Sequence, residues 1–254
     1  NINNCYGNDI STYTLPDKWI VVAAGNRAID LGDAPPTTIE PALANRFGHV
    51  NYAPKLEEWI DWALTKKTMN PDIITFLKFK PQYFHKLDPE QEPTAWPSPR
   101  SWELASEEEY AERNYDWDNN IDRVELNNIY TATVGAEAAT AFVAYLELKK
   151  FYNEKDVENV YKMGAKAKDL PQRADQSYAA SGSIASYKKG KKLTEKELSN
   201  LLEFALNLKD LEKSTPLLSM FKDFHPEVKT ESPYKEIWWK GLKQWHGKLK
   251  ELED

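Results

Sequence analysis

The feature that most constrains the fold is an uninterrupted apolar run, Trp19 to Ala24, which stops at Gly25-Asn26-Arg27. A strand that is apolar at every position, rather than at alternate positions, is typical of a parallel sheet covered on both faces. Phe47 to Tyr52 is the other strand candidate nearby. Because two strands are too few for such a sheet, the sequence predicts that partner strands belong to a preceding part of a longer chain. An initial Asn1 by itself fits either a processed chain or the tail of a longer one.

Composition narrows the class of protein. The 254 residues suggest one or two domains, and 41% hydrophobic with 29% charged residues is ordinary for a globular chain. No apolar run approaches the ~20 residues of a membrane-spanning helix, and the first residues lack the pattern of a signal peptide. The single Cys5 fits a reducing compartment, so we expect a cytoplasmic protein without membrane contact. The net charge of -7 argues against general nucleic-acid binding.

Beyond Pro54 the hydrophobic spacing predicts helices. Leu56 to Leu64 and Gly135 to Tyr152 each place apolar residues on one face, and Asn70-Pro71 gives the next helix a cap and an N1 proline. Thr194 and Glu197 form a capping box ahead of another helix. The last helix, from Ser232-Pro233, is amphipathic, and we expect it to pack on the protein rather than on a membrane.

Three segments carry weaker signals. Glu107 to Asp122 is acidic and rich in asparagine, and we predict a solvated loop there. Gly164 to Tyr187 has weak periodicity, so its structure is left open. Lys188-Lys189-Gly190-Lys191-Lys192 is a basic turn; a solvated loop is the main interpretation, and nucleic-acid contact is the alternative.

Arg100 is the residue that most needs a physical explanation. Ser98 and Pro99 predict a helix start, and a cation in the first turn opposes the helix macrodipole. A bound anion would meet both the free N–H groups and the guanidinium. The alternative is an ion pair between Arg100 and Glu103 or the acidic loop before the helix.

Four motifs, taken in order, resemble the second half of a MoxR-type AAA+ ATPase core. They are the lead-in Tyr13 to Trp19 with the strand ending in Ala24-Gly25-Asn26-Arg27, the segment Pro41 to Phe47, the helix start Ser98-Pro99-Arg100, and the run Val134 to Ala139. The resemblance covers about residues 11 to 150, and residues 153–254 match only loosely.

The resemblance implies a fold and a set of roles. The fold would be mixed α/β and mostly α, with a remnant of a parallel P-loop-type sheet (1–53), a helical lid (54–152) and a helical extension (153–254). Asn26 would position the attacking water or γ-phosphate, and Arg46 would reach a neighbouring subunit's nucleotide as an arginine finger. Arg100, with Pro99 and Ser98, would meet the nucleotide from the lid.

The same resemblance implies cofactors and partners. The intact parent protein would use ATP and Mg²⁺ in a homo-oligomeric, hexameric ring. It would act as a remodeller or chaperone on a protein client, in some cases together with a von Willebrand A-domain protein.

The sequence also departs from the family. It contains no Gly-x-x-x-x-Gly-Lys-Ser/Thr loop and no apolar strand ending in Asp-Glu, so the chain alone is not expected to hydrolyse ATP or to bind it tightly. The four histidines lie far apart without ligand spacing, and no metal site is predicted. No Gly-x-Ser-x-Gly nucleophile motif is present.

Two other functions remain open at this point. One is a non-catalytic helical adaptor that kept the scaffold and lost the hydrolytic half. The other is a nucleic-acid translocase subunit, which the negative net charge disfavours.

Overall fold

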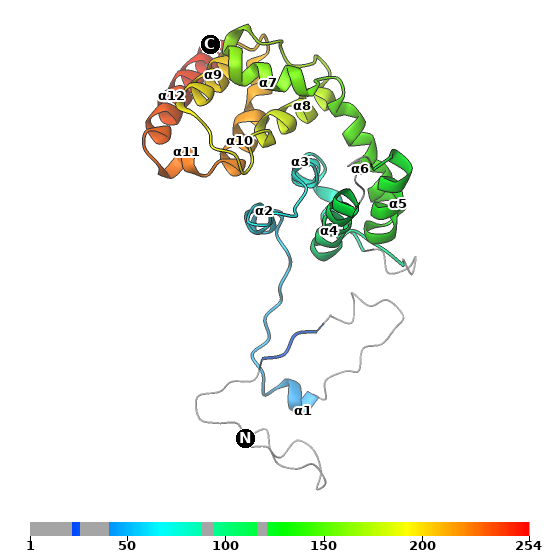
Figure 1. The fold of residues 1–254 in the computed structure, drawn as a ribbon. Helices are drawn as coiled ribbons and strands as arrows, with labels where there is room; N and C mark the ends of the chain where they lie inside the picture. The colour runs from blue at the N-terminus through cyan, green and yellow to red at the C-terminus, as the bar shows by residue number, and fades with distance from the viewer. Residues whose placement is uncertain (1–21, 26–40, 88–93, 116–120, 254) are drawn as a thin grey trace. The chain divides into compact units, whose positions relative to one another are not determined.

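All regular structure in the described part of the chain is helical (Figure 1). The computed structural model describes residues 22–25, 41–87, 94–115 and 121–253. Contacts divide the chain into two units, the first comprising residues 1–53 and 87–93 and the second residues 54–86 and 94–254. The helices are α1 (Pro41–Ala44), α2 (Leu56–Leu64), α3 (Pro71–Phe79), η3 (Pro81–Tyr83), α4 (Pro99–Tyr115), α5 (Arg123–Val134), α6 (Ala136–Lys149), α7 (Glu154–Met163), η5 (Gly164–Lys166), α8 (Ala174–Ser186), α9 (Glu195–Leu206), η6 (Leu211–Lys213), α10 (Ser214–Phe224), α11 (Glu227–Thr230) and α12 (Tyr234–Glu253).

The prediction of a sheet remnant is wrong for the part of both segments that the structure describes. Val22, in the first predicted strand, is 81% exposed and belongs to no strand; residues 19–21 lie outside the described part. The second predicted strand, Phe47 to Tyr52, is irregular, with Val50 88% exposed. A strand pairs its backbone groups only with another strand, and the described residues supply no partner.

The short helix of the first unit agrees with the sequence pattern. α1 begins at Pro41, and the turn after it is closed by bonds from Asn45 N to the Pro41 carbonyl (3.0 Å) and from Phe47 N to the Ala44 carbonyl (3.1 Å). Arg46 lies in this turn and is exposed.

The second unit is built around α3. Asn70 caps this helix, its side-chain oxygen accepting from Asp72 N at 2.8 Å, and Pro71 stands at its first position, as the sequence predicts. Residues 73–77 are all buried. A helix buried on every side is central to its domain, and α2, α6 and α8 pack against α3.

The contact between α3 and α8 is unusually close. A methyl group added at Gly182 of α8 would stand 2.9 Å from Thr75 Cβ and 3.0 Å from the Tyr145 hydroxyl. Tyr145 of α6 donates a hydrogen bond to Thr75 Oγ1 at 3.0 Å, so three helices meet at this point. The stretch from Gly164 to Tyr187, left open by its weak periodicity, contains η5 and α8, and the small residues of α8 allow that helix to lie against the core.

Ion pairs also join α3 to both halves of the second unit. Asp72 pairs with Lys149 of α6, and Lys78 pairs with Asp223 of α10. All four side chains are partly buried. Residues on either side of position 152 thus pack in one unit, while the division of function between 54–152 and 153–254 stays a prediction.

Helices α4, α5 and α6 follow one another and pack pairwise. Gly135 joins α5 to α6 with φ +82°, and a Cβ there would lie 2.7 Å from the Ala95 carbonyl oxygen. The predicted loop from Glu107 is wrong as far as Tyr115, because α4 continues to that residue.

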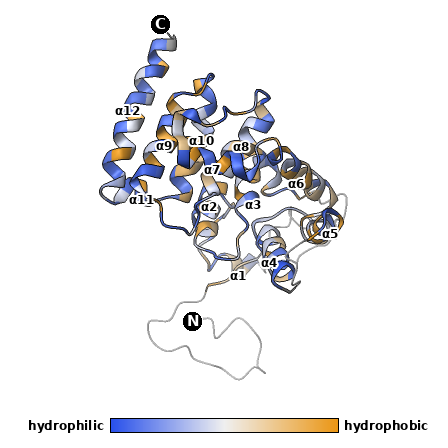
Figure 2. Ribbon diagram, turned by 45° about the horizontal axis from the view of Figure 1, so that its top comes forward, coloured by the Kyte–Doolittle hydropathy of each residue, from blue (hydrophilic) through white to orange (hydrophobic). Residues whose placement is uncertain are grey.

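The final helices complete the unit. The predicted capping box is confirmed by Glu197 N, which donates to Thr194 Oγ1 at 3.3 Å, while Thr194 N donates to the Glu197 carboxylate at 3.0 Å. α12 packs on α9 and α11, burying Trp238 and Trp245. Hydrophilic and hydrophobic residues alternate along it (Figure 2), as on a helix with one apolar face. Among the helices of the described part, none has the length and apolar character needed to cross a membrane.

Candidate functional site

The predicted site residues fall in different parts of the chain. Asn26 lies outside the described residues. Arg46 belongs to the first unit, in the exposed turn after α1. Ser98, Pro99 and Arg100 form the start of α4 in the second unit. Among the predicted site residues, only Ser98, Pro99 and Arg100 lie together, at the start of α4.

Local hydrogen bonds define the start of α4. Ser98 Oγ accepts from Ser101 N at 3.1 Å, and Ser101 Oγ accepts in turn from Ser98 N at 2.7 Å. The Ser98 carbonyl accepts the first helical bond from Trp102 N at 3.0 Å. Ser98 thus satisfies helix-end donors as an N-cap, with Pro99 at the first helical position, which confirms the predicted helix start.

Arg100 projects from this first turn without a partner in the described part of the chain. It is exposed, and no ion pair or hydrogen bond joins its guanidinium to a described residue. Glu103, the alternative partner, pairs instead with Lys66 at 3.7 Å. The loop residues 88–93 lie outside the described part. A cation at a helix N-terminus without a compensating carboxylate is unfavourable for the helix alone, so the position suits a bound anion.

Trp102 anchors the same turn to the core. It is fully buried, and its indole Nε1 donates to the Tyr83 carbonyl at 2.8 Å. Its ring lies 5.7 Å from that of Phe76 and 5.9 Å from that of Phe142. The residue two positions after Arg100 is therefore fixed, which limits how far the first turn of α4 can move independently.

A buried polar network holds the middle of α4. The Glu109 side chain is only 4% exposed, and one carboxylate oxygen accepts from Tyr130 Oη (2.5 Å) and Asn70 Nδ2 (2.7 Å). The other accepts from Arg113 Nη2 at 2.7 Å. Burial, and next the charge of Glu109, raise the pKa of Tyr130 well above its usual range, so the phenol stays a donor. The network joins α4 to α5 and to the cap of α3.

Sequence reasoning missed this network because glutamate counts as polar in a periodicity pattern. Trp102, Ala105, Ser106 and Glu109 are all buried, and their i, i+3, i+4, i+7 spacing marks one helix face. One signal in the sequence does indicate the helix. Arg113 follows Glu109 by four residues, and an ion pair at this spacing supports a helix rather than a loop.

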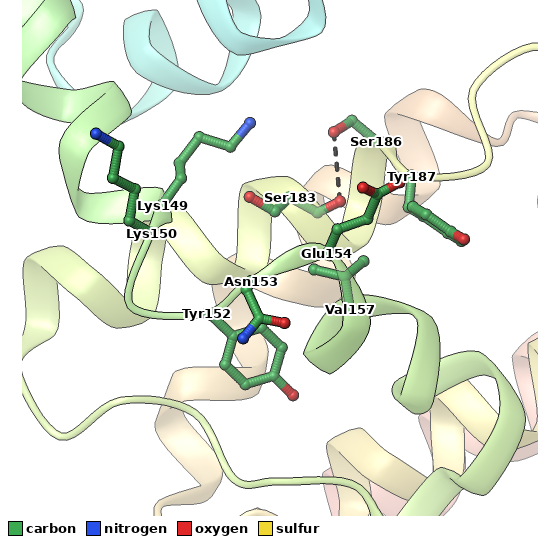
Figure 3. A pocket seen from close by; sticks show the side chains of 9 residues that line it. All are labelled: Lys149, Lys150, Tyr152, Asn153, Glu154, Val157, Ser183, Ser186 and Tyr187. Carbon is green, nitrogen blue, oxygen red and sulfur yellow. Dashed lines mark hydrogen bonds between the residues drawn. The ribbon is translucent and has the colours of Figure 1, made fainter.

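A hollow in the described part lies away from the start of α4. It has a volume of about 490 Å³, and Figure 3 shows the nine residues that line it: Lys149, Lys150, Tyr152, Asn153, Glu154, Val157, Ser183, Ser186 and Tyr187. None of these residues was predicted to bind a ligand. Several of their polar groups already have partners: Lys150 pairs with Glu147 at 2.8 Å, and Ser186 Oγ donates to the Gly182 carbonyl at 2.8 Å.

The basic turn is largely engaged with its own chain. Lys188 pairs with Glu197 at 2.7 Å, and Lys189 donates to the Met69 carbonyl at 3.1 Å. Burial lowers the pKa of Lys189. Lys191 lies over the Tyr187 ring, 5.6 Å from its centroid. These contacts within the chain account for Lys188, Lys189 and Lys191 without a nucleic-acid ligand.

Within the described ranges, no group of three or more His, Cys, Asp or Glu side chains is arranged to hold a metal ion. Comparison of the chain with protein-family models, with curated proteins and with solved structures gives no match.

Proposed function

We propose that this chain is the helical lid and C-terminal extension of a MoxR-type AAA+ ATPase, a ring-forming, nucleotide-driven remodeller of a protein client. The observation that carries the proposal is the exposed Arg100 at the capped start of α4, without an ion-pair partner among the described residues. An exposed guanidinium in the first turn of a helix is suited to phosphate oxygens.

The anchoring of α4 supports a coupling role. Trp102 and Glu109 fix the helix to α3 and α5. A phosphate drawn to Arg100 would therefore act on the second unit through a rigid helix rather than a loose side chain. That is what a lid needs if it is to respond to nucleotide state.

The remaining roles follow from the resemblance in sequence. Asn26 would orient the attacking water, and Arg46 would reach the nucleotide of a neighbouring subunit. ATP and Mg²⁺ would be held mainly by a phosphate loop and an Asp-Glu strand, which this sequence does not contain. A von Willebrand A-domain protein would be one type of partner.

The first test needs only the reading frame upstream of Asn1. A Gly-x-x-x-x-Gly-Lys-Ser/Thr motif followed by an Asp-Glu strand would support the ATPase. An initiator methionine directly before Asn1 would contradict it.

The second test is Arg100→Ala in a chain that includes the phosphate loop. We expect ATP turnover to fall on the order of 10²-fold, as when one charged donor is lost from a phosphoryl-transfer site. Arg100→Lys should lose less, because it keeps the charge without the bidentate geometry. The matched control is Arg123→Ala, another exposed arginine in the first turn of a helix, which should turn over ATP like the parent. Equal turnover in Arg100→Ala and Arg123→Ala would contradict the proposal.

A non-catalytic adaptor is the second candidate. It is favoured by large apolar side chains exposed on charged helices, Leu104 at 46% and Trp239 at 52%, an arrangement typical of protein interfaces. The same upstream reading frame separates the two functions.

A further inference from the structure

The exposed face of α12 carries a row of cations around one tryptophan. At 3.6 residues per turn, Lys235, Trp239, Lys243, His246 and Lys250 fall within about 80° of the helix circumference, and all five are exposed. We call them the basic stripe. None of its lysines lies within 4.0 Å of a described carboxylate, whereas Lys162 on α7 pairs with Glu158 at 2.6 Å.

The exposed face of α4 carries the opposite charge. Leu104, Glu107, Glu108, Ala111 and Glu112 lie along it and are exposed. We call them the acidic stripe. Its three glutamates form no ion pair with a described residue. In each stripe an apolar side chain stands four positions before a charged one: Leu104 before Glu108, and Trp239 before Lys243.

The two stripes do not face one another within one molecule. α4 packs on α5, while α12 packs on α9 and α11. In both views α4 and α12 lie at opposite ends of the second unit (Figures 1 and 2). Each stripe is therefore open to a separate partner.

We propose that the basic stripe of one copy binds the acidic stripe of a second copy. Lysines and glutamates without internal partners meet, and Trp239 packs near Leu104 as the apolar centre. Tryptophan within a polar rim is the usual anchor of a protein interface, and opposite charges on the two patches fix the partner and its register. Because the two surfaces differ, the contact is head-to-tail and either closes into a ring or continues as a filament.

Two other occupants are less well supported. The net charge of -7 repels a nucleic acid at long range. A membrane would require an apolar helix face, but that face of α12 is packed on the protein through Trp238 and Trp245. The remaining partner that fits the basic stripe is a protein with an acidic face, and this chain has such a face on α4.

Charge reversal tests the contact in the chain as it stands. The basic variant is Lys243→Glu with Lys250→Glu, and the acidic variant is Glu108→Lys with Glu112→Lys. The matched control for the basic variant is Lys196→Glu with Lys209→Glu, which changes two exposed lysines outside the stripes and shifts the net charge by the same amount. Association is measured by sedimentation and light scattering over a range of concentrations and salt, with circular dichroism to check folding.

We expect each stripe variant to weaken association at least ~tenfold, because like charges then face each other across the interface. The variant that combines all four stripe changes should regain association, and the control should associate like the parent. Added salt should weaken association of the parent.

Several results would overturn the proposal. These are a parent that stays monomeric, stripe variants that associate like the control, or a four-change variant that does not recover. Binding of a single-stranded oligonucleotide or of anionic vesicles, lost in the basic variant without any self-association, would assign the stripe to that ligand instead. The contact needs no nucleotide, so its failure would leave the Arg100 experiment unaffected.

Discussion

The two units of the chain differ in how far they bury their apolar side chains. In the described residues of the first unit, Val22, Val50 and Tyr52 are between 78% and 88% exposed. In the second unit, Ile73 and Phe76 are fully buried. A helix satisfies its backbone within one segment and can then bury a face on its neighbours, whereas a strand needs other strands first. An apolar run is therefore not enough to make a core.

The largest expected effect is in the centre of the second unit. Phe76→Ala removes a fully buried ring that lies 5.4 Å from Phe142 and 5.7 Å from Tyr145. We expect it to lower the free energy of unfolding by about 3–5 kcal/mol, the usual cost of such a cavity. Phe151→Ala, the same change at a side chain 56% exposed, is the control and should cost about 1 kcal/mol or less. Similar urea midpoints for the two variants would break the comparison.

The next effect concerns the polar network on α4. Glu109→Ala should cost about 2–4 kcal/mol, because Tyr130, Asn70 and Arg113 lose a common acceptor. Its neighbour Glu108 is exposed, and Glu108→Ala should stay within about 0.5 kcal/mol of the parent. Urea denaturation measures both. Equal losses would mean that Glu109 is not buried as described.

The pH dependence of stability gives a smaller effect. His225 is 2% exposed, and burial lowers its pKa although Glu227 Oε1, 3.1 Å from Nδ1, favours the charged form. Since the folded-state pKa lies below the ordinary 6.5, the unfolded chain takes up a proton first as pH falls. The histidine's contribution is therefore intact above pH 6.5 and is lost below it, with a slope of at most about 1.4 kcal/mol per pH unit.

Unfolding titrations of the parent and of His225→Gln between about pH 7.5 and pH 5.5, on either side of the ordinary histidine pKa, measure this contribution. The variant should show a shallower fall in stability toward acid. An unchanged slope would mean that His225 does not titrate with folding.

The smallest effect is expected in the first unit. Val50→Ser with Tyr52→Ser should change the free energy of unfolding by less than about 0.5 kcal/mol, since both side chains are already exposed. Urea midpoints measured beside those of Phe76→Ala give the test. A loss of several kcal/mol would show that these residues are buried in solution and would remove the contrast between the units.

Local signals in the sequence predicted the parts of the fold that depend on local chemistry. Asn70-Pro71 begins α3 and Thr194 caps α9, because capping involves neighbours within a few residues. The prediction of strands was wrong because strand pairing depends on distant partners. The length of α4 was predicted wrongly because Glu109 is buried only through Tyr130 and Asn70, which lie far from it in the sequence.

The candidate site divides in the same way. Ser98 and Pro99 predicted the start of α4, and the structure confirms it. That Arg100 lacks Glu103 as a partner could not be predicted, because Lys66, which occupies Glu103, comes from an earlier part of the chain. The acidic stripe could not be predicted either, since the sequence pattern predicts a loop for its glutamates rather than one face of a helix.

The close contact at Gly182 has a mechanical consequence. Because even a methyl group at Gly182 would stand 2.9 Å from Thr75 Cβ and 3.0 Å from the Tyr145 hydroxyl, α8 has little clearance to slide or rotate on α3. A force that displaces α4 would be transmitted to α3 through the hydrogen bond between Asn70 and Glu109. Because α8 packs closely on α3, it would be displaced together with α3. Residues on both sides of position 152 would then move as one stiff lever, and any hinge would have to lie outside this three-helix contact.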